Sequence, residues 1–132
     1  MNPDDLLDRL RAETAHIAAF AADRDLTVPV PCCPGMTTGE VVRHLGSVYR
    51  RITIWVREQT PPGNYEQGPA DGEELIDWFR SAAVTLCDSL ASRDPNAPCD
   101  SWSPWDRTAG FWWRRMAHET TVHRADVESG RR

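Results

Sequence analysis

Apolar side chains recur every three or four positions in four long segments of the chain, which is the spacing of amphipathic helices. In the first segment, for example, Leu6, Leu10 and Ile17 fall on one stripe. No segment alternates apolar and polar positions over a useful length, so the sequence predicts no β-sheet. The predicted helices cover residues 4–23, 37–59, 71–92 and 108–128.

Polar residues mark where these helices begin and end. Thr37 and Glu40 have the spacing of a capping box, in which each side chain bonds the backbone amide of the other residue. Asp71 and Glu74 repeat this spacing at the third helix, and Gly130 is expected to end the fourth. The connections are rich in proline and glycine. The pattern predicts an all-α four-helix bundle with a long connection before the fourth helix.

Composition narrows the class of protein. A chain of 132 residues suggests a single domain over residues 1–132, and the net charge of -5 argues against a nucleic-acid partner. No apolar run approaches the roughly 20 residues of a membrane span, and the acidic N-terminus is no secretory signal. We therefore expect a cytoplasmic protein with no membrane partner. The cysteines have neither zinc-ribbon nor disulfide-framework spacing, so free thiols are expected.

The predicted fourth helix carries a glutamate and a histidine on one face. Glu119 and His123 are four residues apart, so an oxygen and a nitrogen can reach one point. Trp112 and Met116 share this face, which is therefore expected to point into the bundle. His118 begins an HE pair, but the next histidine lies five residues on, about 140° around the helix. This spacing excludes the HExxH metalloprotease motif.

A third candidate donor lies on the predicted second helix. His44 falls between Val41 and Val48 on the apolar stripe. Two imidazoles and a carboxylate with one open position make up a catalytic zinc site, and helical bundles hold such sites between facing helices. The alternative without a metal is a hydrogen-bonded His44 in the core and an ion pair between Glu119 and Arg115.

Two stretches of the chain resemble a known family. VPCCPGMTTGEVVRHLGSVYR, residues 30–50, resembles the first signature of the mycothiol-dependent maleylpyruvate isomerase family, in its N-terminal metal-binding domain. WWRRMAHETTVHRADVE, residues 112–128, resembles the second signature. The family belongs to the DinB-like superfamily of metal-binding four-helix bundles, so the resemblance implies that fold for most of this chain.

The resemblance also implies a ligand set. The metal ligands of the family map onto His44, Glu119 and His123, the residues that the helical faces already selected. Zinc is the expected metal and nickel is the alternative, because imidazole and carboxylate ligands accept several divalent ions. Asp126 matches the second signature, where it either orients a ligand from outside the coordination sphere or pairs with an arginine.

The implied activity uses mycothiol, a low-molecular-weight thiol, as cosubstrate with an electrophilic substrate. Metal binding deprotonates a thiol, and the thiolate can then attack carbon for isomerisation or thiol transfer. Arg43 and Arg115 flank the ligands and could steer an anionic substrate. Trp102 and Trp105 are expected to cover the end of the bundle, and Cys33 is expected to be structural.

Three departures from the family pattern keep other interpretations open. Met36 and Ala125 replace residues that are usually aromatic, and the chain ends at Arg132, where family members often continue into a second domain. One alternative is a non-catalytic metal-binding bundle that acts as an interaction or regulatory module. A further alternative is a structural helical dimer without metal, and a homodimer is compatible with the enzyme as well.

Overall fold

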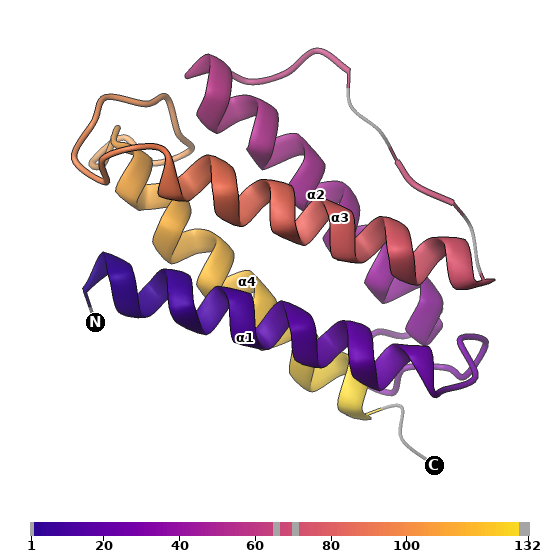
Figure 1. Cartoon of the computed structure of the whole chain (residues 1–132). Helices are drawn as coiled ribbons and strands as arrows, with labels where there is room; N and C mark the ends of the chain where they lie inside the picture. The colour runs from indigo at the N-terminus through magenta and orange to yellow at the C-terminus, as the bar shows by residue number, and fades with distance from the viewer. Residues whose placement is uncertain (1, 65–66, 70–71, 130–132) are drawn as a thin grey trace.

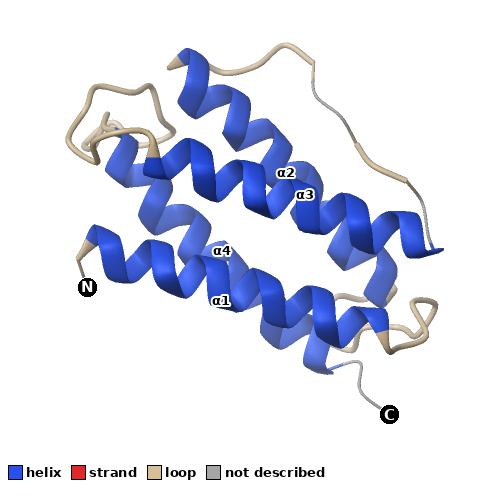
Figure 2. Ribbon diagram, in the orientation of Figure 1, coloured by secondary structure: helices blue, strands red, loops and turns tan. Residues whose placement is uncertain are grey.

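A computed structural model describes residues 2–64, 67–69 and 72–129, and these residues form a bundle of four α-helices (Figures 1 and 2). The predicted helix boundaries agree with the structure to within a few residues. The only β-bridges in the described part of the chain are isolated pairs, which confirms the expected all-α class. The helices are α1 (Pro3–Ala22), α2 (Thr38–Glu58), α3 (Gly72–Ala91) and α4 (Ala109–Ser129).

The helices pair in a specific order and direction. Each helix packs mainly against two neighbours, and α1 and α2 lie diagonally across the bundle, as do α3 and α4. On α2 and α4, His44 meets His123 and Trp55 meets Trp112, so these two helices are antiparallel. By contrast, α1 runs parallel to α4, and α2 runs parallel to α3 (Figure 1). The topology is therefore up-down-down-up.

This topology explains the connections. A long connection, residues 92–108, precedes α4 as the sequence predicted. The connection that runs the length of the bundle is instead the one between α2 and α3, because parallel neighbours require the chain to return (Figure 1). Side chains of α2 hold this connection: Arg43 Nε donates to the Gly68 carbonyl at 3.1 Å and Ser47 Oγ to the Gln67 carbonyl at 2.8 Å.

The helix ends follow the predicted capping chemistry where the structure describes them. Both hydrogen bonds of the Thr37–Glu40 capping box are present at the start of α2. Gln59 ends this helix in the left-handed conformation, with φ of 65°. The predicted start at Asp71 and stop at Gly130 lie outside the described residues.

The core is formed by large apolar side chains from every helix. Burying one such side chain fully contributes about 1.5–3 kcal/mol, so this cluster is the main source of stability. Among the described helices, none is long and apolar enough to cross a membrane. The largest fully buried side chains include Leu10, Ile17, Leu45, Tyr49, Ile52, Leu75, Phe79, Leu86, Leu90, Trp112 and Met116.

Glycines allow an indole ring to lie flat between α2 and the connection that follows it. The ring of Trp78 on α3 packs against Gly46 of α2 and Gly68 of the connection. A Cβ atom at Gly68 would lie 2.6 Å from this ring, and a Cβ atom at Gly46 would overlap it. Only a residue without a side chain fits at either position.

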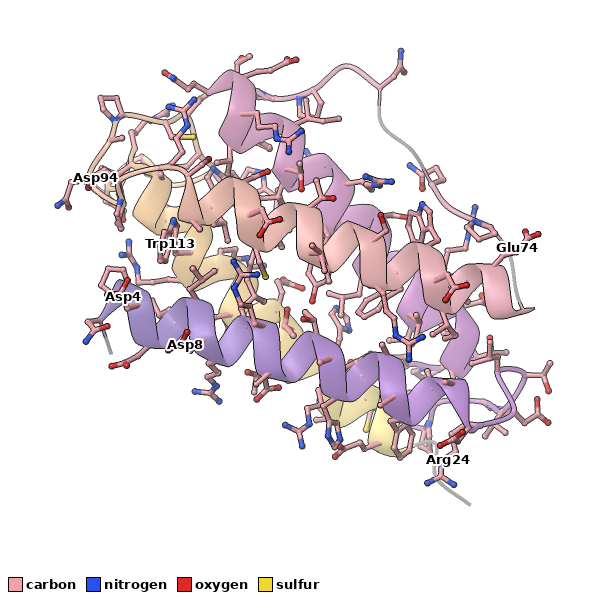
Figure 3. The ribbon with its side chains drawn as sticks, viewed as in Figure 1. Asp4, Asp8, Arg24, Glu74, Asp94 and Trp113 are labelled. Atoms are coloured by element: carbon pink, nitrogen blue, oxygen red, sulfur yellow. The ribbon has the colours of Figure 1, made fainter. Side chains whose placement is uncertain are left out.

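The two ends of the bundle carry different parts of the chain. At one end, the N-termini of α1 and α4 lie together, and Asp4 and Trp113 line one surface hollow there (Figure 3). At the other end, the last turns of α4 lie close to the connection between α1 and α2 (Figure 1). The predicted metal ligands belong to this second end.

Candidate metal centre

α2 and α4 bring the three predicted metal ligands side by side. His123 Nε2 lies 3.3 Å from Glu119 Oε2, one helical turn away on α4. The rings of His44 and His123 meet edge to face, with centroids 5.4 Å apart and an interplanar angle of 75°. Two helices far apart in the sequence thus place His44, Glu119 and His123 near one another.

These side chains lie at the rim of the core and not inside it, which corrects the expectation from the apolar stripes. His44 is exposed, and the side chains of Glu119 and His123 keep 21% and 17% of their surface accessible. The buried face of α2 is centred on residues such as Leu45 and Tyr49, so His44 falls at its edge. Partial exposure lowers the desolvation cost of a carboxylate at this position.

The surroundings of His44 favour its neutral form. The pKa of its imidazole is lowered, mainly by desolvation and further by His123, while Glu119 acts in the opposite direction. Neutral imidazole is the form of histidine that coordinates metal ions. The direction of this shift is compatible with the predicted role.

His123 faces a carboxylate with each of its ring nitrogens. Nε2 lies 3.3 Å from Glu119 Oε2, and Nδ1 lies 3.1 Å from Asp126 Oδ2. A neutral imidazole has a single N–H and can donate to one of these oxygens only. The second contact requires a further proton or a metal cation between the two atoms. A carboxylate on the far nitrogen is also the usual partner of a metal-binding histidine.

The donor pair on α4 has the spacing of a tetrahedral site. With bonds of about 2.0–2.1 Å, two donors on a tetrahedral zinc lie about 3.3 Å apart. The measured separation between His123 Nε2 and Glu119 Oε2 is 3.3 Å. Within the described residues, however, no three His, Cys, Asp or Glu side chains converge closely enough to hold an ion. The three predicted ligands are therefore neighbours without a closed coordination sphere.

Both arginines that were predicted to steer a substrate are engaged within the protein. Arg43 Nε binds the Gly68 carbonyl and so holds the α2–α3 connection. Arg115 Nη2 donates to Glu119 Oε1 at 2.6 Å, and its guanidinium carbon lies 5.3 Å from the centre of the Trp102 ring. Arg115 therefore acts directly on a candidate ligand.

A surface cavity of about 300 Å³ opens beside His44. Its volume is at the lower end of the range for small-molecule sites, about 300–1,000 Å³. Its lining combines charged, polar and apolar side chains, so it suits a small polar molecule. The lining residues are Met36, Glu40, Arg43, His44, Ser47, Val48, Arg51 and Gln67.

Cys33 reaches the site from the turn before α2, a contact that sequence reasoning missed. Burial raises the pKa of the Cys33 thiol, and the charge of the Asp126 carboxylate raises it further. A backbone hydrogen bond of 2.9 Å from Val30 to Met36 closes the turn. The Cys-Pro-Gly motif marked the turn, but no sequence signal identified Asp126 as its partner.

The two tryptophans of the last connection differ in their packing. Trp102 lies edge-on against Trp112, with ring centroids 5.1 Å apart, and is 46% exposed. Trp105 is 92% exposed, so the expectation that it covers the bundle end is wrong. The connection itself is tightly held, since Ser101 Oγ donates to the Asp106 carbonyl at 2.5 Å.

The all-α bundle of four helices is of the DinB-like type. Within this class, the family model of the mycothiol maleylpyruvate isomerase N-terminal domain matches residues 7–128, and the chain belongs to this family. Comparison with curated proteins and with solved structures finds no match. The family membership predicted from the two signatures is thereby confirmed.

Proposed function

We propose that the protein holds a divalent metal ion, zinc or alternatively nickel, with His44, Glu119 and His123, and uses it to activate a low-molecular-weight thiol such as mycothiol. The observation that carries this proposal is the placement of His123 between two carboxylates. Its Nε2 and Glu119 Oε2 are separated by 3.3 Å, the spacing of two ligands on one tetrahedral ion. Family membership over residues 7–128 supports a mycothiol-related role.

The bound metal would lower the pKa of the thiol and so supply a thiolate for isomerisation or thiol transfer. The remaining tasks fall to side chains of this chain. Asp126 keeps a proton on His123 Nδ1, so that Nε2 presents its lone pair toward Glu119. The cavity beside His44 would receive the electrophilic substrate, and the guanidinium group of Arg51 on its wall favours an anionic one.

A second candidate function is a non-catalytic, metal-binding interaction module. Trp105 favours it, because an indole that is 92% exposed on a tightly held connection is typical of a partner contact. Incubation with a thiol and a panel of anionic electrophiles distinguishes the two functions. The enzyme converts an electrophile only when the thiol is present, and it also consumes the thiol if the reaction is thiol transfer. The module changes neither compound.

Elemental analysis of chelator-treated protein after reloading with zinc or nickel tests the metal site. We expect about one equivalent per chain in the wild type and none in the His44→Ala, His123→Ala double variant. His118→Ala is the matched control, because this exposed histidine lies on the same helix and should leave metal content unchanged. Absence of metal from the wild type, or equal loss in the control, contradicts the proposal.

A further inference from the structure

Arg115 lies between a candidate ligand and an aromatic ring. Its Nη2 donates to Glu119 Oε1 at 2.6 Å, and its guanidinium carbon lies 5.3 Å from the centre of the Trp102 ring. The side chain is 38% exposed, while that of Glu119 is 21% exposed. Contacts on two sides restrict the guanidinium far more than a single surface ion pair would.

Helix stability alone does not explain this placement. An acidic residue stabilises a helix more when it precedes its basic partner by four positions, and here the order is reversed, from Arg115 to Glu119. Arg115 Nε is also buried and has no hydrogen-bond partner among the described residues. A local arrangement that sacrifices stability is more typical of a functional site.

The contact determines which carboxylate oxygen faces the histidine. Because Arg115 holds Oε1 of Glu119, Oε2 is the atom left at 3.3 Å from His123 Nε2. We propose that Arg115 is a positioning residue, which pre-orients Glu119 for the metal, and that Trp102 holds Arg115 in place. This inference rests on the proposed metal-dependent function and concerns how tightly the site binds its ion.

Trp102 is itself supported from several sides. Its ring meets Trp55 and Trp112 edge to face, with centroids 6.1 Å and 5.1 Å away. The guanidinium carbon of Arg51 lies 5.7 Å from the same ring. Buried aromatic residues thus hold the Trp102 ring, and this ring contacts the Arg115 guanidinium. The packing of the core is thereby linked to the orientation of Glu119.

Zinc affinity of the full chain, measured by competition with a chromogenic chelator, tests this role without any assay of activity. We expect Arg115→Gln to bind zinc about 10–100-fold more weakly, the usual effect of removing a residue that orients a ligand. Arg115→Lys should fall between this variant and the wild type, because lysine keeps the charge but lacks the planar group. Trp102→Ala should cause a smaller loss in the same direction.

Arg80→Gln is the matched control, because Arg80 is an exposed arginine on α3 that pairs only weakly with Asp77, at 3.7 Å. Thermal unfolding of the metal-free Arg115 variants should be nearly unchanged, which separates positioning from a structural role. Unchanged or tighter zinc binding by Arg115→Gln overturns this inference alone. A wild type that takes up no zinc overturns both the inference and the proposed function. If Arg115→Gln does not fold, the zinc affinities of Arg115→Lys and Trp102→Ala decide the question.

Discussion

Along the interface between α2 and α4, the half that contains Trp55 and Trp112 is closely packed, whereas the half that contains His44 and His123 is open to solvent. The two indoles are 3% and 0% exposed, with ring centroids 4.7 Å apart. The ring centroids of His44 and His123 lie 5.4 Å apart, yet His44 is exposed. One pair of helices therefore contains both a packed seam and a more exposed polar cluster.

A hydrogen bond separates the two halves. The hydroxyls of Tyr49 and Thr120 lie 2.5 Å apart, and both residues are fully buried. Burial raises the pKa of the Tyr49 hydroxyl far above its usual range, so the group stays protonated and can donate. The comparison indicates that the packed half supplies stability, while the open half is free to carry polar groups that a core would exclude.

The largest expected effect comes from the packed half. Trp112→Ala should lower the free energy of unfolding by about 3–5 kcal/mol, because it empties a buried site and removes the hydrogen bond from the indole Nε1 to the Asp100 carbonyl. His44→Ala in metal-free protein should change it by less than about 0.5 kcal/mol. Urea denaturation measures both values. Similar losses in the two variants would show that the halves do not differ in this way.

A smaller loss of stability should show that solvent exposure near His44 is limited to the side of α2 that faces α4. On another face of the same turns, Gly46→Ala places a Cβ atom into the Trp78 ring and should cost about 1–3 kcal/mol. Gly63→Ala is the control, since nothing lies within 4 Å of its added Cβ atom. Thermal unfolding of the two variants makes the comparison, and a Gly46→Ala protein as stable as Gly63→Ala would contradict the packing described.

The boundary itself can be tested by removing one hydroxyl. Tyr49→Phe should cost about 1–2 kcal/mol, because Thr120 is left buried without its partner. Replacing both residues, Tyr49→Phe with Thr120→Val, should cost less than the sum of the single changes. Urea denaturation of the three variants gives the coupling energy. Strict additivity would mean that the short contact contributes no net stability.

The smallest expected effect concerns acid stability of the connection that carries Trp102. The pKa of the Asp106 carboxyl is lowered, chiefly by a hydrogen bond from the Thr108 hydroxyl and further by Arg114. A lowered folded-state pKa stabilises the protein above the unfolded pKa of about 4, and this contribution is lost as pH falls through the folded value.

Asp106→Asn should therefore be less stable than the wild type at pH 7 by about 0.5 kcal/mol, since the ion pair is partly exposed. The difference should be smaller at pH 3, which lies below the unfolded pKa of about 4. Thermal unfolding at the two pH values measures this change. A difference that persists at low pH would assign the effect to packing of the side chain and not to its charge.

The helices could be predicted because their signals are local. Periodic apolar residues and the Thr37–Glu40 capping box determine most of the boundaries without reference to the rest of the chain. The pairing of Glu119 with His123 follows from helical spacing for the same reason. The apolar stripe wrongly placed His44 in the core. Val41 and Val48 lie along the edge of the buried face of α2, which is centred on residues such as Leu45 and Tyr49.

Contacts made by the connections could not be predicted in this way. Cys33 reaches Asp126, and Arg115 reaches Trp102, only because loops fold back onto helices that are distant in sequence. Arg43 was expected to face a substrate, yet it binds the Gly68 carbonyl of the connection between α2 and α3. The path of a loop depends on tertiary contacts, and these contacts leave no regular pattern of residues in a single sequence.

The parallel course of α1 and α4 has a practical consequence for purification. The last turn of α4 lies at the end of the bundle that holds His123 and Asp126, whereas the start of α1 lies about 30 Å away, at the far end. A polyhistidine tag joined after Ser129 would bring extra imidazoles next to the candidate site, where they would compete for the same ion. A tag joined before Pro3 would instead lie about one helix length from the candidate site, so its imidazoles would not disturb a measurement of metal content.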